Sequence, residues 1–552
     1  MSAEPTETAR RPRRGVTTSV ARAAGIIAVA TLLARVAGLA RTLVFSDSVG
    51  TSGVGSVYQT VNTIPNVLFE VAAGGVLAAA AVPLIAGQLG AQREDDADQT
   101  SSALLTWAVA VLLPLSALLA FAAPALSNFM LGARYSQEAV DLGTRMLVIF
   151  APQVVLYGIG IVLTGVLQAR RSFLAPALAP LLSSLVVIAA YVAYGQLTQA
   201  ASSPEAVSDA AVLVLAGGTT LGVVVLSLPL FVPAWRAGAR LRPTFRFPEG
   251  TVPRVAALAG AGMVALLAQQ AAVLVTLWLA NNRGSQGAVN VYAYVQAVYL
   301  LPYAVLAVPI ATSAFPALAH GEGTGRREHG TLSRSLQAIL LLCGGAAAVL
   351  VAIARPVGTF FQALDRGASA GGGDALAAVP ETLVAYAPGL VGFGAAALLT
   401  RALYVRGRPA LAALAVAGGW LVAALWPIIT LPDDAGAAGT LRSLGAASSV
   451  GMTLSALALA LLVRRAWGVE ATRGAGRTLG ALVVAAAVSA GIGDVLAFYW
   501  APTGLTGAVL ASVVIAGVVT VLYLAVMFAA DRGARAAGRP AWRRGRRRGS
   551  DA

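Results

Sequence analysis

The sequence predicts an all-α integral membrane protein with about fourteen transmembrane helices, arranged as two six-helix lobes followed by two C-terminal helices. Hydrophobic residues make up 58% of its 552 residues and charged residues only 11%, whereas a soluble domain has about 25% charged residues. About fourteen apolar segments reach the roughly 20 residues that a spanning helix needs. Arginines gather in every second gap between these segments, which is typical of cytoplasmic loops.

The apolar segments form two groups of six and a final pair. The first group covers residues 20–45, 56–88, 102–127, 139–168, 173–194 and 209–234. The second group covers residues 251–281, 287–317, 332–355, 380–404, 409–431 and 440–463, and the final pair covers 478–499 and 504–529. The second and eighth segments are long for one span and contain prolines, so we expect kinked or tilted helices there.

The positions of the arginines predict that both ends of the chain are cytoplasmic. Basic tails cover residues 1–19 and 530–552, and further arginines cluster around Arg171, Arg240, Arg327, Arg406 and Arg473. The segment 196–208 has no basic residue and is expected on the external side. The resulting domains are an N-lobe (20–234), a cytoplasmic linker (235–250), a C-lobe (251–463) and a final helix pair (464–529).

A weak internal repeat supports the division into two lobes. The stretch around Pro83 (Ala-Val-Pro-Leu-Ile-Ala) resembles the stretch around Pro316 (Ala-Phe-Pro-Ala-Leu-Ala), 233 residues later. Pro-Ala-Leu-Ala at Pro176 recurs at Pro409 with the same offset of 233 residues. Because the basic gaps keep the same order in both halves, this is a parallel repeat, of the kind transporters use to build a substrate site between two halves.

The composition argues against several other classes of function. The net charge of +15 is explained by topology signals and by contacts with anionic headgroups, rather than by nucleic-acid binding. The chain has no lysine, so it lacks the phosphate-binding loop of an ATP-driven pump. One cysteine, Cys343, excludes a disulfide within the chain, and His320 and His329 lie in a charged, solvated loop. We therefore expect neither an enzyme nor a resident cofactor or metal.

Polar residues inside the apolar segments are the candidate binding residues, because polar groups in a membrane are costly unless they face water or a ligand. Arg35 and Arg41 lie in the first segment and suit bidentate binding of phosphate. Glu70 in the second segment needs a partner, for which either arginine is the natural candidate; snorkelling of Arg41 and a purely structural ion pair remain alternatives. The other candidates are amides, for which helix packing is the alternative role: Asn66, Gln269, Gln270 and Gln296.

An ordered set of short motifs resembles the MurJ/MviN family. Ala34-Arg35-Val-Ala-Gly38-Leu-Ala-Arg41 resembles its first-helix S-R-x-x-G-x-x-R-D signature, and Ile64-Pro65-Asn66-Val-Leu with Ala81-Val82-Pro83 resembles its second helix. Similar matches follow at Arg171–Pro180, Ala307–Pro316, Ala385–Gly392 and Arg401–Arg406. The resemblance covers roughly residues 25–530 and implies a lipid II flippase fold: fourteen helices, a cationic cavity between two lobes, and a groove for the lipid tail at the last two helices.

The sequence also departs from the family pattern at charged positions. Thr42 replaces the acid after the second arginine, Phe69-Glu70 replaces a basic pair, and Gln296-Ala297 replaces an Asp-Arg pair. The cavity is therefore expected to be less cationic than usual, and no sodium site carries over. The expected function is flipping of lipid II or a similar polyprenyl-pyrophosphate glycolipid in the bacterial cytoplasmic membrane. The alternatives are export of another lipid-linked glycan or a drug, and a non-transporting scaffold for cell-wall synthesis proteins.

Overall fold

A computed structural model of the chain describes residues 14–71, 77–198, 203–319, 326–365 and 373–537. Within these residues it contains helices and no strands. Thirteen helical segments are long and apolar enough to cross a membrane. The expected second span is the exception, because it is divided into α2 (Val54–Phe69) and α3 (Leu77–Gly90) with an undescribed stretch between them. The predicted fold class, with about fourteen spans, is confirmed.

The N-lobe begins with α1 (Arg14–Ser48), followed by α2 and α3. Its remaining helices are α4 (Glu94–Phe121), α5 (Ala123–Leu131), α6 (Gln137–Phe150), α7 (Gln153–Ala169), α8 (Leu174–Thr198), α9 (Asp209–Val212), α10 (Gly218–Ser227) and α11 (Phe231–Arg236). Short 3-10 or π turns connect several of them: η2 (Gly132–Arg134), η3 (Pro204–Ala206), η4 (Leu213–Gly217) and η5 (Leu228–Leu230).

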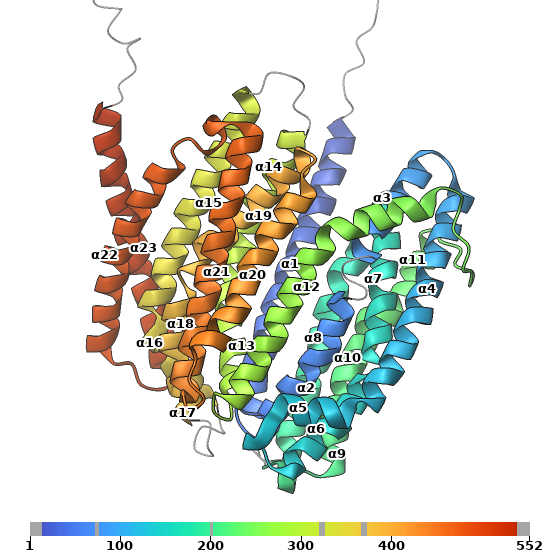
Figure 1. Cartoon of the computed structure of the whole chain (residues 1–552), viewed down its shortest axis with the longest axis horizontal. Helices are drawn as coiled ribbons and strands as arrows, with labels where there is room; N and C mark the ends of the chain where they lie inside the picture. The colour runs from blue at the N-terminus through green and yellow to red at the C-terminus, as the bar shows by residue number, and fades with distance from the viewer. Residues whose placement is uncertain (1–13, 72–76, 199–202, 320–325, 366–372, 538–552) are drawn as a thin grey trace, which may run out of the picture.

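The C-lobe begins with α12 (Thr251–Asn282), which crosses from the N-lobe to the C-lobe in Figure 1. Its other elements are α13 (Ala288–Pro302), η6 (Tyr303–Ala307), α14 (Val308–Ala319), α15 (Arg326–Ala352), α16 (Ala354–Leu364), α17 (Gly373–Ala377), α18 (Val379–Tyr386), α19 (Gly389–Val405), α20 (Pro409–Thr430) and α21 (Gly436–Trp467). A short turn, η8 (Val469–Thr472), leads to α22 (Ala475–Trp500) and α23 (Gly504–Ala537).

Prolines explain why several spans consist of two helices. Proline lacks the amide hydrogen that an interior helical position donates, but it fits the first turn of a new helix. The second helix of a divided span directly follows a proline at Pro152 and Pro388, and the short helices α5 and α16, which continue after a complete span, carry Pro124 and Pro356 in their first turns. In the eighth span Pro302 ends α13 and a π-helical turn, η6, follows, which is the distortion expected from the prolines in this segment.

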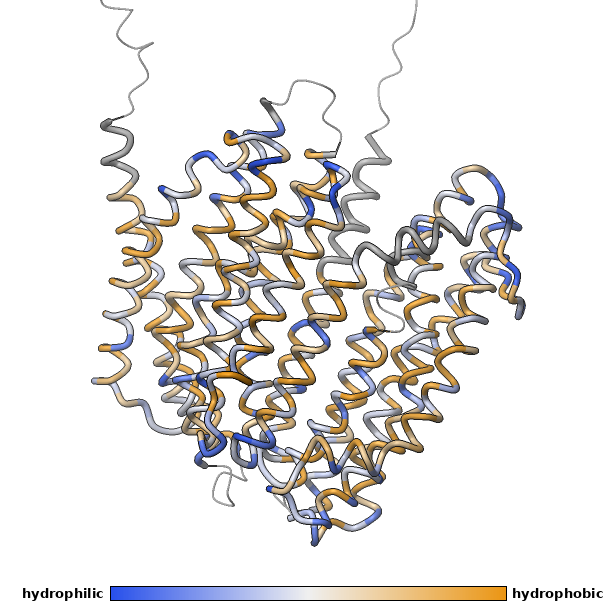
Figure 2. The backbone as a smooth tube through the Cα atoms, in the orientation of Figure 1, coloured by the Kyte–Doolittle hydropathy of each residue, from blue (hydrophilic) through white to orange (hydrophobic). Residues whose placement is uncertain are grey.

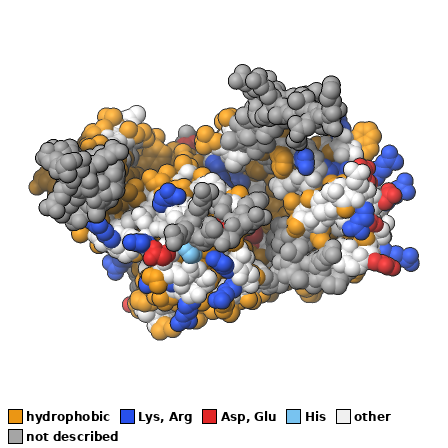
Figure 3. Space-filling view, turned by 90° about the horizontal axis from the view of Figure 1, so that it is seen from above, with side chains coloured by type: hydrophobic (Ala, Val, Ile, Leu, Met, Phe, Trp, Pro, Cys, Tyr) orange, Lys and Arg blue, Asp and Glu red, His pale blue; other side chains and the backbone are white. Residues whose placement is uncertain are grey.

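Hydropathy follows the membrane-spanning direction. Figure 2 shows hydrophobic residues along the middle of the helices and hydrophilic residues near the two ends of the molecule. The start of α1 and the end of α23 lie at the same end, at the top of Figure 1. Figure 3 looks onto that end and shows basic side chains over both lobes, all of them arginine because the chain has no lysine.

The linker between the lobes is an extended segment that lies against α4. The amide of Arg242 donates to the hydroxyl of Ser102 at 3.0 Å, and the amide of Thr244 donates to the hydroxyl of Thr106 at 3.0 Å. Trp107 on the same helix donates its indole N–H to a carbonyl of this segment at 3.1 Å. These bonds satisfy backbone groups that a helix or sheet would otherwise pair, so the linker has a defined path from the N-lobe to α12.

The last two helices pack on the C-lobe rather than between the lobes. The Tyr523 hydroxyl of α23 donates to the carbonyl of Leu341 in α15 at 2.8 Å. Two glycines of α15 make this close approach possible, because a Cβ atom at Gly344 or Gly345 would lie only 2.9 Å from Leu482 or Tyr523, respectively. Small residues at such crossings allow tight packing in a membrane, where no hydrophobic effect drives helices together.

Candidate functional site: a closed interface, a polar pocket and an apolar groove

The two lobes are joined by hydrogen bonds at the end of the molecule opposite the start of α1 and the end of α23. Asn281 of α12 exchanges hydrogen bonds with Thr60 of α2 and accepts one from the Tyr135 hydroxyl at 2.9 Å. Asn290 donates to the carbonyl of Thr51 at 2.7 Å, and the Thr51 hydroxyl donates to the buried carboxylate of Asp365. These contacts lie in or next to the connections that follow odd-numbered spans, so they all lie on one side of the membrane.

An arginine joins the lobes at the rim of this interface. Arg134 donates to the carbonyl of Gly284 at 2.8 Å and to the carbonyl of Asp433 at 3.1 Å. The Asp433 carboxylate in turn lies 3.0 Å from the guanidinium of Arg283. Gly132 allows the approach, because its φ of 68° suits glycine and a Cβ there would lie 1.9 Å from the Asn282 Oδ1 atom. We call this set of contacts the closed interface.

A polar pocket of about 230 Å³ lies on the inner side of the N-lobe. It is lined by residues of α1, α2, α7, α8, α10 and α13, and Arg41 is its one charged lining residue among the described residues. The amide and hydroxyl residues that line the same pocket are Thr42, Gln59, Asn62, Thr63, Asn66, Tyr157, Ser183, Tyr191 and Thr219. The arrangement offers one cation and many neutral hydrogen-bonding groups, which is suitable for an anionic, hydroxyl-rich ligand.

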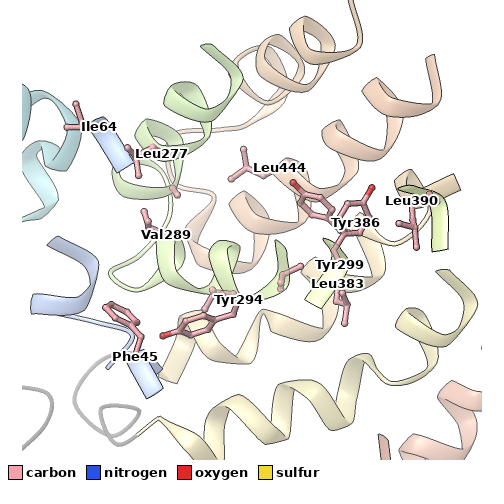
Figure 4. Close-up of a cluster of buried hydrophobic side chains, with 14 of the residues drawn as sticks. Phe45, Ile64, Leu277, Val289, Tyr294, Tyr299, Leu383, Tyr386, Leu390 and Leu444 are labelled. Carbon is pink, nitrogen blue, oxygen red and sulfur yellow. The ribbon is translucent and has the colours of Figure 1, made fainter. Parts of the chain in front are cut away.

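A hydrogen-bonded set of hydroxyls fixes the wall of the pocket. Tyr58 of α2 lies 2.9 Å from the hydroxyl of Tyr191 and 2.8 Å from that of Thr219, which ties α2 to α8 and α10. Phe45 packs against both tyrosine rings, with centroids 5.3 Å and 5.2 Å away. Figure 4 shows Phe45 facing Tyr294 of the C-lobe, and both residues line the pocket. The wall is therefore preorganised and lies next to the other lobe.

The pocket contains an acceptor that no described residue uses. The Asn62 Oδ1 atom is buried and receives no hydrogen bond within the described part of the chain. The neighbouring Asn66 donates instead to the Asn62 carbonyl, at 2.8 Å. An unsatisfied buried acceptor costs about 1–3 kcal/mol, so this amide is a strained point in the pocket wall.

A second and larger cavity is an apolar groove of about 1120 Å³ between the C-lobe and α22. Its walls come mainly from α15, α19, α21 and α22 and consist largely of Ala, Gly, Val and Leu side chains. Charged residues line it only at its ends among the described residues. Arg464 and Thr472 lie at the end nearer the chain termini, and Arg355 and Asp494 lie at the other end, where they pair at 2.9 Å.

Comparison with known proteins identifies the family. A family model described as "Lipid II flippase MurJ" matches residues 45–529. The chain belongs to the MurJ family. It is 28% identical over 514 residues to "Lipid II flippase MurJ" of Burkholderia cenocepacia, covering 90% of this chain and 94% of the relative. It is 27% identical over 332 residues to "Probable lipid II flippase MurJ" of Rhizobium tropici, and that match spans only 59% of the relative.

Solved structures agree in fold with this member of the MurJ family. A structure titled "Lipid II flippase MurJ, inward closed conformation" matches with a TM-score of 0.70 at 17% identity, covering 91% of this chain and 98% of that one. A multidrug resistance transporter of the MATE family in an inward-facing conformation matches with a TM-score of 0.61 at 16% identity, covering 81% of this chain and 99% of that one. The chain is a multi-pass membrane protein and not an enzyme.

The structure brings together only part of the predicted MurJ-like site. Arg41 and Asn66 line the polar pocket, whereas Arg35 does not, and both arginines are exposed residues of α1. The expected pair between Glu70 and an arginine is not formed among the described residues, because Glu70 is an exposed residue at the C-terminal end of α2, beyond the pocket. Gln269, Gln270 and Gln296 lie on α12 and α13 and do not line it either.

Sequence reasoning missed most of the neutral residues of the pocket. Tyr58, Tyr191 and Thr219 belong to apolar segments and have no charge to attract notice, and they come from three separate spans. Gln59 and Asn62 carried a better signal, because Asn62 lies three residues after Gln59 and four residues before Asn66 on one helix. That spacing places the three amides on one face of α2.

Proposed function

We propose that this chain is a lipid II flippase that works by alternating access in the bacterial cytoplasmic membrane. The observation that carries the proposal is the closed interface on one side of a two-lobed molecule, with a polar, arginine-containing pocket directly behind it. In alternating access two lobes rock about a site near the membrane midplane, so one side must close by specific contacts while the site stays polar. Membership of the MurJ family supplies the substrate class.

The pocket and the groove divide the substrate between them. The pocket volume of about 230 Å³ is below the roughly 300–1,000 Å³ of a pocket for a drug-sized ligand, so it holds the pyrophosphate and the adjacent hydroxyls rather than the whole head group. Arg41 binds the pyrophosphate, and the neutral amides and hydroxyls of the lining bind the adjacent hydroxyls. The groove beside α22 holds the polyprenyl tail, which has no polar group to satisfy.

The orientation follows from the arginines. The end that carries the start of α1 and the end of α23 faces the cytoplasm, where positive charge is retained, and the closed interface therefore faces outward. The basic tails contact anionic lipids at roughly 1 kcal/mol for each arginine near the surface. The protein moves its substrate from this cytoplasmic side to the external side.

The test uses a strain in which this chain is the only lipid II flippase, under a repressible promoter. Repression should leave lipid II in the membrane but abolish its accessibility to an impermeant reagent at the outer surface, and re-expression should restore it. Unchanged accessibility after depletion would refute the proposal. Export of a different polyprenyl-linked glycan would leave lipid II accessibility unchanged and remove that glycan from the surface instead.

A further inference from the structure

The two ends of the apolar groove differ in charge pairing. At the external end Arg355 is paired with Asp494 and also lies over the ring of Phe498, 5.6 Å from its centroid. At the cytoplasmic end Arg464 lines the groove, and none of the described acids pairs with it. The nearest acid along the chain, Glu470, lies 3.0 Å from Arg473 instead. The groove therefore offers one cation free to bind an anion, at its cytoplasmic mouth.

The mouth of the groove is a built structure and not a loose loop. Arg464 lies in the last turn of α21, where the helix dipole favours a cation. The turn that follows is fixed to α15, because Ser333 and Gln337 both donate to the carbonyl of Arg473 at 2.8 Å. Trp467 adds a hydrogen bond of 3.0 Å to the Ala402 carbonyl. The position of the Arg464 backbone relative to α22 is thus well defined.

The length of the groove indicates the kind of lipid that it accepts. From Ala475 to Asp494 its wall follows α22 for about 29 Å, at 1.5 Å per residue. This is close to the full hydrocarbon thickness of about 30 Å, whereas a phospholipid chain reaches across only one leaflet, about half of that distance. A polyprenyl chain is long enough to fill the groove, and its phosphate would then lie at one mouth.

We propose that Arg464 is a second phosphate-binding residue, which holds the pyrophosphate of a polyprenyl lipid at the cytoplasmic mouth of the groove before the head group enters the Arg41 pocket. The inference rests on the proposed function, because it assigns the tail of the same substrate to the groove. It adds a loading step: the tail enters the groove from the cytoplasmic leaflet, and Arg464 fixes the phosphate end there. The paired Arg355 at the opposite mouth offers no such site.

The experiment compares Arg464→Gln with Arg465→Gln in the purified full chain, in nanodiscs of phosphatidylcholine. Arg465 is the matched control, because it is the next residue on the same helix turn, is exposed and does not line the groove. Binding of undecaprenyl pyrophosphate and of undecaprenol is measured by titration. Arg464→Gln should weaken binding of the pyrophosphate about tenfold and leave binding of the alcohol unchanged. Arg465→Gln should change neither.

Each other outcome overturns the inference. Equal losses in the two variants would mean that only net charge matters, and an equal loss for undecaprenol would mean that Arg464 shapes the groove and does not bind phosphate. If phosphatidylglycerol in the nanodiscs displaced the pyrophosphate from the parent chain at equal concentration, the occupant would be bulk anionic lipid. The binding assay involves no transport. If Arg464→Gln binds the pyrophosphate normally while the parent chain flips lipid II, the role of Arg464 is refuted and the proposed flippase function is not.

Discussion

Charged residues inside apolar helices were the part of the site that could be predicted at the level of single residues. Arg41 stood out because an arginine in a membrane helix costs at least about 2.5–3.5 kcal/mol on insertion scales unless it faces water or a ligand. Its surroundings were not predictable, because Tyr58, Tyr191 and Thr219 are neutral and come from different spans. For Glu70 the sequence predicted an arginine partner that the described residues do not provide. The need for a partner was clear, but sequence gives no distance between residues on two helices.

Replacement of Arg41 tests the pocket directly. Arg41→Ala should lower lipid II transport at least about tenfold, because a hydrogen bond to a charged group contributes about 1.5–3 kcal/mol. Arg41→Lys should retain part of the activity, since it keeps the charge but loses the two-pronged geometry. Transport into the outer leaflet of proteoliposomes is the measurement.

Arg145→Ala is the control for the Arg41 series. Arg145 pairs with Asp209 at 2.6 Å, and both side chains are largely exposed. Such a surface pair is worth only about 0–1 kcal/mol, so transport should change little. If Arg41→Ala transports as well as Arg145→Ala at equal protein abundance, the pyrophosphate is not bound in this pocket.

At the level of helices, the sequence predicted which spans are irregular but not how the lobes meet. Prolines in the second and eighth segments indicated distortion, and both spans are indeed divided. The closed interface left little trace in the sequence, because it depends on loops such as the one around Gly132 and on ordinary residues such as Asn281 and Thr60. Loop contacts between distant segments depend on the packed fold, which no local pattern encodes.

Gly132→Ala should weaken the closed interface. Its Cβ atom would lie 1.9 Å from the Asn282 Oδ1 atom of the other lobe, in addition to the strain of φ 68°. Gly436→Ala is the matched control, because its φ is 67° and a Cβ there meets no atom within 4 Å. With a reporter cysteine at Gln59 in the pocket, Gly132→Ala should raise labelling from outside and Gly436→Ala should not. Equal labelling in the two variants would show that the effect comes from backbone strain and not from the clash with Asn282.

Filling the groove tests its role as the site of the tail. Ala487→Trp places a large ring among the groove-lining residues, whereas the adjacent Val488→Trp places the same ring on a residue that is 45% exposed and does not line the groove. Ala487→Trp should reduce binding of undecaprenol and transport of lipid II severalfold, because the chain loses the surface that it would contact. Val488→Trp should leave both unchanged. The reverse order of effects would place the tail on the outer face of α22.

For the whole molecule, the repeat predicted the two-lobed architecture through two short sequence similarities that share one offset. Pro83 lies in α3 and Pro316 in α14, each in the second half of the second span of its lobe. Pro176 lies in the first turn of α8 and Pro409 begins α20, the fifth span of each lobe. The offset of 233 residues therefore relates equivalent elements. The attachment of α22 and α23 to the C-lobe had no such signal, because nothing in the N-lobe repeats them.

Side-specific labelling tests the orientation of the whole molecule. In a Cys343→Ala background, a cysteine at Ser203 should react with an impermeant maleimide added to intact spheroplasts, because the segment 196–208 has no basic residue and Ser203 is exposed. A cysteine at the exposed Arg408, in an arginine-rich gap, should react only after the membrane is permeabilised. Ser333 is unsuitable as the cytoplasmic reporter, because it is buried and bonded to the Arg473 carbonyl. Labelling of both cysteines in intact spheroplasts would contradict the topology. Labelling of Arg408→Cys alone would mean that the molecule has the opposite orientation. The closed interface would then face the cytoplasm, and the Arg464 mouth of the groove would face outward.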